Sequence, residues 1–263
     1  ARMLRASDAV VAISADFRPT LDRFGVAPER VQVIENWAPL DELAPAPRHN
    51  AWSAQHGLDP ATVLCYAGTL GLKHDPELLL ALARHFRHQP GVRLVVVSEG
   101  RGRQWLGAKA AEEGLANVVL VDYQPYDRLA EVLGAADVLV CILNQEAGAF
   151  SVPSKVLTYH CAGRPLLAAI PAANLAARVV REAGSGLVVE PGDADALVEA
   201  AARLVADAGL RARLARNGRR FAEAAFDIGR IGGRFERLFM ELTEARGPSR
   251  AGEVGSIGRT KNG

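Results

Sequence analysis

The sequence is poor in cysteine, in net charge and in long apolar runs, and each shortage excludes a class of protein. Its 263 residues include three cysteines and no Cys-x-x-Cys pair, which excludes a disulfide framework and the usual zinc or redox motifs. The 31 basic residues nearly balance 30 acidic ones, so a net charge of +1 provides no global attraction for nucleic acid. No apolar run reaches the roughly 18 residues of a transmembrane helix, and residues 1–14 lack a signal-peptide cleavage pattern. We expect a cytoplasmic protein, with peripheral attachment to the inner face of the membrane as the second option.

Short apolar runs recur along the chain and predict strands. They are rich in β-branched residues and continuous rather than alternating, which is typical of strands buried on both faces of a parallel sheet. The predicted strands are 10–13, 31–34, 63–67, 92–97, 118–121, 138–143, 166–170 and 187–189.

Amphipathic stretches follow most of these runs and predict helices. The predicted helices are 76–87, 103–114, 126–133, 154–162, 175–184, 194–208, 210–224 and 228–246. Strand–helix alternation at this spacing predicts an α/β fold, a Rossmann-like doubly wound parallel sheet, with additional helices at the C-terminal end. The turn-rich, proline-containing stretch 36–47 is interpreted as a linker, and the Gly/Ser-rich residues 247–263 as a flexible tail.

The loop after the predicted strand 63–67 is one candidate binding element. In an open parallel sheet, ligands bind beyond the carboxyl ends of the strands. Gly68 and Gly71 would allow close approach of a ligand to the backbone, and Lys73 adds a positive charge. His74 shares this loop. The alternative interpretation is a tight turn with a surface lysine.

The segment after the predicted strand 138–143 is more informative. Pro153 and Ser154 form a helix-start signal in which Ser154 would be the N-cap. A helix N-terminus attracts anions, yet Lys155 places a cation in the first turn, against the helix dipole. We interpret this combination as a site for a negatively charged ligand. Gly163 is expected to end the helix in the left-handed conformation.

Two other signals are interpreted conservatively. Residues 99–103 contain part of a G-x-G-x-x-G pattern, but the third glycine is missing, which disfavours nicotinamide-dinucleotide binding. His160 is expected to be a packed helix residue, and the other histidines show no metal-binding spacing.

Several motifs, in this order, resemble family-4 glycosyltransferases of the GT-B fold, over about residues 7–242. The similar segments are SDAVVAIS at 7–14, VQVIENW at 31–37, YAGTLG at 66–71, the stretch 117–138, and PSKVLTY at 153–159 followed by GRP at 163–165. The last of these is similar to the branch that makes bacterial surface polysaccharides.

The resemblance implies both a domain organisation and an activity. Residues 1–50 would be the remnant of an N-terminal acceptor domain with the linker, and residues 51–246 the donor-binding domain. The complete enzyme would be a retaining glycosyltransferase of the hexosyl or N-acetylhexosaminyl type that needs no metal. Its donor would be a nucleotide sugar, for which a UDP-sugar is the first candidate and a GDP-sugar the second. Its acceptor would be a glycan or a lipid-linked molecule. The missing N-terminal domain would be a partner, and the expected activity is that of the complete enzyme, with the activity of the isolated chain left open.

The same resemblance implies a set of site residues. Those expected to bind the donor are Gly68, Thr69, Gly71, Lys73, Asp122, Gln124, Ser154, Lys155 and Thr158. The expected catalytic residues are Lys155 and Glu146. The family's E-x7-E pair is absent, because Thr158 and Phe150 occupy its two positions, and Glu146 replaces the first Glu only if the loop carries an insertion.

The final predicted helix, 228–246, would cross back to the missing domain and expose Phe235, Leu238 and Phe239. Two alternatives to a transferase remain. The missing Glu pair favours a non-catalytic nucleotide-binding module. A nucleotide-sugar epimerase of the same fold would need further acid and base groups around the donor.

Overall fold

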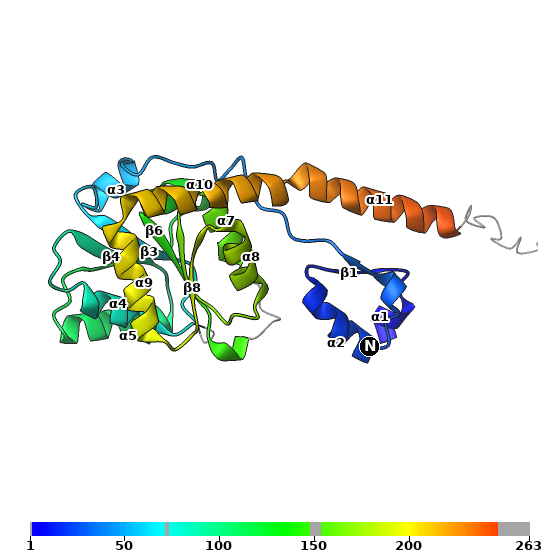
Figure 1. Cartoon of the computed structure of the whole chain (residues 1–263), viewed down its shortest axis with the longest axis horizontal. Helices are drawn as coiled ribbons and strands as arrows, with labels where there is room; N and C mark the ends of the chain where they lie inside the picture. Colours follow the sequence, from blue (N-terminus) through cyan, green and yellow to red (C-terminus); the bar gives the residue numbers. More distant parts are fainter. Residues whose placement is uncertain (1, 72–73, 148–153, 247–263) are drawn as a thin grey trace, which may run out of the picture.

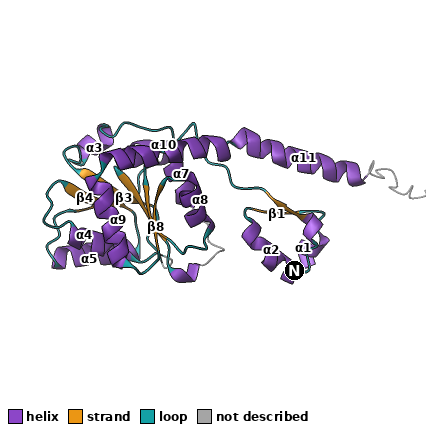
Figure 2. Cartoon of the chain, viewed as in Figure 1, coloured by secondary structure: helices purple, strands orange, loops and turns teal. Residues whose placement is uncertain are grey.

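The computed structural model describes residues 2–71, 74–147 and 154–246, which form a large α/β domain and a small N-terminal unit (Figure 1). The large domain contains a six-stranded parallel sheet covered by helices on both faces (Figure 2). Its strands are β3 (Thr62–Ala67), β4 (Val92–Val97), β5 (Val118–Val121), β6 (Val138–Ile142), β7 (Leu166–Ala169) and β8 (Gly186–Val189). The predicted fold class is confirmed.

The strand order is β5-β4-β3-β6-β7-β8, and every pairing is parallel. From β3 the chain continues through β4 to the edge strand β5. It then crosses back to β6, beside β3, and continues through β7 to the other edge strand, β8. The order therefore reverses between β3 and β6. In doubly wound sheets such a reversal leaves a crevice at the carboxyl ends of the two strands.

Each face of the sheet has its own apolar core, because successive side chains of a strand point to opposite faces. Leu64 and Tyr66 of β3 belong to one core, and Val63 and Cys65 to the other. The first core packs against α4 (Pro76–His85), α5 (Arg101–Glu112) and α9 (Ala194–Ala206). The second packs against α3 (Ala51–Gln55), α6 (Leu129–Gly134), α7 (Ser154–Cys161) and α8 (Leu175–Ala183). The continuous apolar runs of the sequence are thus buried on both sides.

The N-terminal unit is built around a two-stranded parallel ladder with a small core. Its elements are α1 (Arg2–Ala6), β1 (Val10–Ala12), η1 (Ala15–Phe17), α2 (Arg18–Arg23), η2 (Pro28–Arg30) and β2 (Val31–Val33). The helices α1, α2 and α3 were not predicted from the sequence. They are too short to show an apolar period, and α3 relies on a capping box between Asn50 and Ser53.

Two long helices end the described chain. The first, α10 (Ala208–Ala225), packs against α7, and the second, α11 (Ile228–Arg246), runs past the N-terminal unit (Figure 1). Leu238 of α11 is buried with Ile34, and Phe235 packs against the same cluster. The prediction that these two side chains are exposed is wrong, because the linker end of the N-terminal unit covers them. Phe239 is 60% exposed, as predicted.

The three cysteines are free and buried, as expected of small apolar side chains. In the part of the chain that the structure describes, no helix combines the length and apolar character needed to cross a bilayer.

Candidate functional site

A cavity of about 500 Å³ lies at the carboxyl edge of the sheet, where the strand order reverses. Its walls come from the ends of β3, β4 and β6, from the loops that follow β3 and β5, and from the start of α7. The apolar lining, with a few polar groups, is typical of small-molecule sites. The lining residues are Ala67, Gly68, Thr69, His74, Val97, Tyr123, Gln124, Leu129, Val132, Leu133, Leu143, Ser154, Lys155, Thr158 and Tyr159.

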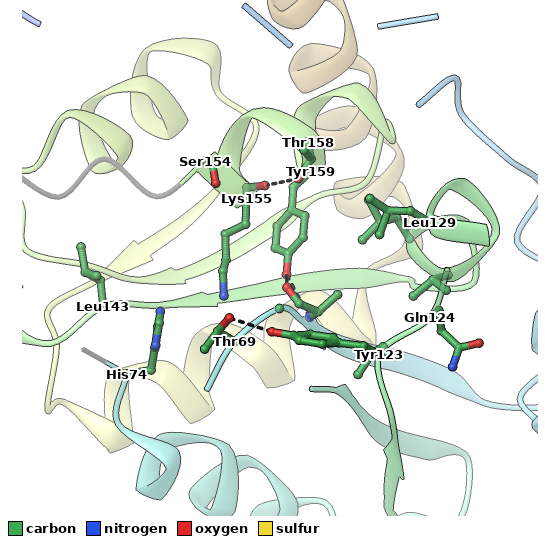
Figure 3. Close-up of a pocket in the computed structure, with 15 residues that line it drawn as sticks. Thr69, His74, Tyr123, Gln124, Leu129, Leu143, Ser154, Lys155, Thr158 and Tyr159 are labelled. Atoms are coloured by element: carbon green, nitrogen blue, oxygen red, sulfur yellow. Dashed lines mark hydrogen bonds between the residues drawn. The ribbon is translucent and has the colours of Figure 1, made fainter. Parts of the chain in front are cut away.

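Lys155 lies in the first turn of α7 and extends into this cavity. In Figure 3 its side chain points from α7 into the space between His74 and Tyr159, above Thr69. The Lys155 Nζ donates a hydrogen bond to the Tyr66 hydroxyl over 2.8 Å and lies 3.9 Å from the centroid of the Tyr66 ring. The contact with the ring face adds a cation–π attraction.

The ammonium has no acidic partner among the described residues. Within the described ranges, no Asp or Glu lines the cavity and no ion pair involves Lys155. Burial lowers the pKa of Lys155 because removal of water disfavours the charged form. A buried cation without a counter-ion is costly to the folded protein. An anionic ligand in the cavity would supply the missing charge.

Gly68 lies directly beside this ammonium. Its φ of +129° is one that other residues rarely adopt, and an added Cβ would lie 3.2 Å from the Lys155 Nζ. The Gly68 N–H donates to the Val97 carbonyl over 2.9 Å, which joins the loop after β3 to the end of β4. The glycine therefore leaves room for the lysine and for a ligand next to it.

Three tyrosines hold the loop after β3 in place. The Tyr66 hydroxyl donates to the Thr69 carbonyl over 2.7 Å, and the hydroxyls of Thr69 and Tyr123 lie 2.7 Å apart. The Tyr159 hydroxyl donates to the Ala67 carbonyl and accepts from the Ala67 N–H, both over 3.0 Å. The sequence analysis missed all three tyrosines. Only the position of Tyr66, next to the glycine loop at the end of a predicted strand, could have signalled one of them.

The structure brings together six of the residues expected to bind a donor, all of them in the lining of the cavity. They are Gly68, Thr69, Gln124, Ser154, Lys155 and Thr158. His74 also lines the cavity. The structure places Ser154 inside α7, as its first residue, rather than before the helix as a cap, and Pro153 lies outside the described residues. The αL end of this helix at Gly163, with φ +61°, is confirmed.

Other predicted residues lie outside the lining. The Gly71 N–H donates to the His74 Nδ1 over 3.2 Å, and Asp122 forms a 2.9 Å ion pair with Arg103. Glu146 is exposed in η4 (Gln145–Ala147) and does not line the cavity. Lys73 and Phe150, and the predicted tail 247–263, lie outside the described residues.

The linker borders the same region. A second cavity of about 210 Å³ is lined by the linker residues 36–39 and by Ser154, Leu157 and Thr158 of α7. Ser154 and Thr158 line both cavities. Trp37 is 51% exposed, so a large aromatic side chain stands close to the start of α7.

His160, by contrast, serves packing. Its ring is buried between α7 and the turn before β8, with Nδ1 2.6 Å from the Val156 carbonyl oxygen and Nε2 2.7 Å from the Ser185 hydroxyl. The interpretation of His160 as a packed helix residue is confirmed.

The family described as glycosyl transferases group 1 matches residues 49–221, which is more than half of the chain. The chain belongs to this family. The predicted resemblance to glycosyltransferases is therefore confirmed at this level. The assignments to family 4 and to the surface-polysaccharide branch remain predictions.

D-inositol 3-phosphate glycosyltransferases are among the curated proteins similar to this chain in sequence. That of Xylanimonas cellulosilytica is 30% identical over 232 residues, which cover 83% of this chain and 53% of the relative. That of Stackebrandtia nassauensis is 30% identical over 234 residues, covering 81% and 50%. The chain thus spans about half the length of these relatives.

Solved structures show the same fold. Sucrose-phosphate synthase from Thermosynechococcus elongatus has a TM-score of 0.73 at 22% identity, over 93% of this chain and 60% of that one. Anabaena Alr3699/HepE in complex with UDP-glucose has a TM-score of 0.76 at 19% identity, over 92% and 66%. At these identities the likeness supports the GT-B glycosyltransferase architecture of the large domain.

Proposed function

We propose that this chain is the donor-binding part of a glycosyltransferase that takes a sugar from a nucleotide diphosphate. The observation that carries the proposal is the half-buried Lys155 ammonium beside the start of α7, at the reversal point of the sheet, which has no carboxylate partner among the described residues. A diphosphate there would accept hydrogen bonds from the Lys155 Nζ and from the free N–H groups of the first turn of α7.

The same two groups would assist the reaction. When the bond from the sugar to the diphosphate breaks, negative charge grows on the leaving phosphate oxygen. Fixed positive groups in a site shielded from water stabilise that charge in the transition state. Lys155 and the α7 N-terminus would thus lower the barrier as well as bind the donor. Glu146 stays a proposed catalytic carboxylate, and Gly71, Lys73 and Asp122 stay proposed donor-binding residues.

The apolar end of the cavity suits the nucleoside. Leu129, Val132 and Leu133 line it together with Tyr123 and Gln124. We propose UDP as the preferred nucleotide of the donor and GDP as the second candidate. The UDP-glucose bound to the Anabaena structure supports the choice of UDP. Retaining transfer of a hexosyl or N-acetylhexosaminyl group without a metal is also part of the proposal. The acceptor would be a glycan or a lipid-linked molecule in polysaccharide synthesis. The names of the curated relatives add D-inositol 3-phosphate as an acceptor to test.

The test is calorimetric binding of UDP, GDP, ADP and dTDP to this chain, with and without EDTA. We expect one nucleotide to bind selectively and EDTA to leave its affinity unchanged. Lys155→Ala should weaken binding by about 1.5–3 kcal/mol, the value of a hydrogen bond to a charged group. Absence of binding by a folded chain, or unchanged affinity of Lys155→Ala, would contradict the proposal.

A non-catalytic nucleotide-binding module is the second candidate. Two features of the cavity favour it: Thr158 stands at a position where the family has a carboxylate, and none of the described residues that line the cavity is acidic. Turnover of a UDP-sugar by the full-length protein separates the two. A protein that binds UDP in this cavity yet transfers and hydrolyses no sugar would be such a module.

A further inference from the structure

Tyr66 is the buried partner of Lys155 and lies at the carboxyl end of β3. Its side chain is fully buried in the core on the α4 face, and its hydroxyl contacts two residues that line the cavity, Lys155 and Thr69. That hydroxyl makes two hydrogen bonds, one to the Thr69 carbonyl over 2.7 Å and one from the Lys155 Nζ over 2.8 Å. It therefore connects the loop after β3 to the cation on α7.

The directions of these two bonds follow from the groups involved. A carbonyl only accepts and an ammonium only donates, so the Tyr66 proton points to Thr69 and an oxygen lone pair points to Lys155. The ammonium has three N–H donors, of which Tyr66 takes one. Two donors remain free to face an anion in the cavity. Among the described residues, no other hydrogen-bond partner of the Lys155 Nζ is found.

Side chains from several other elements face the same region as the ammonium. Cys141 comes from β6, Tyr159 from α7, and His74 and Tyr123 from the loops after β3 and β5. Burial raises the pKa of Cys141 to about 11, so its thiol stays neutral beside the lysine. Burial also raises the pKa of Tyr66, which keeps its hydroxyl neutral and able to accept. Tyr66 is thus the polar group that fixes where the cation lies.

We propose that Tyr66 is a positioning residue for donor binding, whose hydroxyl holds the Lys155 ammonium and the loop at Gly68 and Thr69 against the same diphosphate. This inference rests on the proposed function. Tyr66 would act through Lys155 and the loop, without touching the substrate itself. Its ring would remain under the ammonium, so loss of the hydroxyl alone should move the cation.

The first measurement follows Lys155 in the absence of any nucleotide. The chain has four lysines, Lys73, Lys109, Lys155 and Lys261, so their ¹³Cε signals can be resolved and assigned with Lys155→Met. Tyr66→Phe should lower the pH at which Lys155 titrates, because the charged form loses an acceptor. The exposed Lys109, which pairs with Glu112, should titrate as before and serves as the internal control.

The second measurement is UDP affinity as a function of pH. Tyr66→Phe should bind UDP about tenfold more weakly at neutral pH, which corresponds to the loss of one charge-assisted hydrogen bond. The pH above which UDP affinity decreases should also be lower in Tyr66→Phe than in the wild type. The matched variant Tyr123→Phe removes a hydroxyl of the same cavity that contacts Thr69 instead of Lys155. The UDP affinity of Tyr123→Phe should decrease over the same pH range as that of the wild type, whether or not the affinity itself is weaker.

The outcomes separate the two proposals. Circular dichroism must first show that Tyr66→Phe is folded; if it is not, the lysine titration is measured with 3-fluorotyrosine at position 66, which keeps the ring and the hydroxyl but makes the oxygen a weaker acceptor. An unchanged Lys155 titration would overturn the role of Tyr66, whether or not nucleotides bind. A lowered titration together with no nucleotide binding by the wild type would overturn the proposed function and leave the contact between Tyr66 and Lys155 standing.

Discussion

The half-buried cations at the two ends of the same parallel sheet differ in the partners that the chain gives them. At the amino end, Arg48 pairs with Asp137 over 2.8 Å and donates to the carbonyls of Leu58 and Ala61. Arg164 at the same end donates to the carbonyls of Ala46 and Gly134 over 2.9 and 2.6 Å.

At the carboxyl end, the ammonium of Lys155 contacts one neutral hydroxyl and no carboxylate among the described residues. A cation with its partners supplied by the chain stabilises the fold, whereas one without them costs stability and is available to a ligand. The comparison separates an end of the sheet where the chain supplies the partners of its cations from an end where the cation has no carboxylate among the described residues.

The largest expected effect is at the amino end. Arg48→Met should lower the free energy of unfolding by about 1.5–3 kcal/mol, because the partly buried Asp137 would lose its charged partner and keep the Val63 N–H as a donor. Urea denaturation followed by circular dichroism measures it. Lys109→Met, which breaks an exposed pair with Glu112, is the matched control and should leave the midpoint unchanged. Similar midpoints for the two variants would remove the contrast between the two ends.

At the carboxyl end, Lys155→Met should stabilise the ligand-free chain, in contrast to Arg48→Met at the amino end. Removal of the unpaired charge should raise the free energy of unfolding of the ligand-free chain by about 1 kcal/mol, a typical gain where stability opposes function. The same variant should lose about 2 kcal/mol of UDP binding. Denaturation and calorimetry on one preparation check both signs. A destabilised Lys155→Met would show that the cation is structural after all.

Gly68→Ala sharpens the comparison at the loop. At φ +129° and 3.2 Å from the Lys155 Nζ, the added methyl group should cost about 1–2 kcal/mol of stability. Gly71→Ala is the matched control, because its Cβ would meet only the Thr69 methyl group, at an ordinary 3.6 Å. Equal thermal midpoints for the two variants would contradict the close packing of Gly68 against Lys155.

The smallest expected effects are those of pH. Burial lowers the pKa of Lys155 below its value in the unfolded chain, so the stability penalty is fully present at low pH. Stability should rise with pH between the folded and the unfolded pKa. UDP affinity should fall over the same range, because the anion needs the protonated amine. Calorimetry above pH 8, where the phosphate groups have already ionised, measures this, and Lys155→Met should show neither trend.

Much of the fold could be predicted from the sequence, because parallel strands buried on both faces leave continuous apolar runs. The strands from β3 to β8 and the helices from α4 to α11 lie close to the predicted ranges. The carboxyl ends of such strands share one edge, so the loops at Gly68 and Ser154 could be predicted to meet. Leu238 could not be assigned correctly, because the residue that covers it, Ile34, lies in another part of the chain.

The sequence by itself determined the class of fold, the edge of the sheet at which the cavity lies and the presence of a cation there. Periodicity and the chemistry of glycine and of helix ends are local properties, and they can be inferred from neighbouring residues. The tertiary structure alone decided that Lys155 meets Tyr66, 89 positions away, and meets no carboxylate in the described chain. It also decided that Asp122 pairs with Arg103 and that Glu146 faces solvent. The physical reason is that burial and charge pairing depend on which distant segments the sheet order brings together.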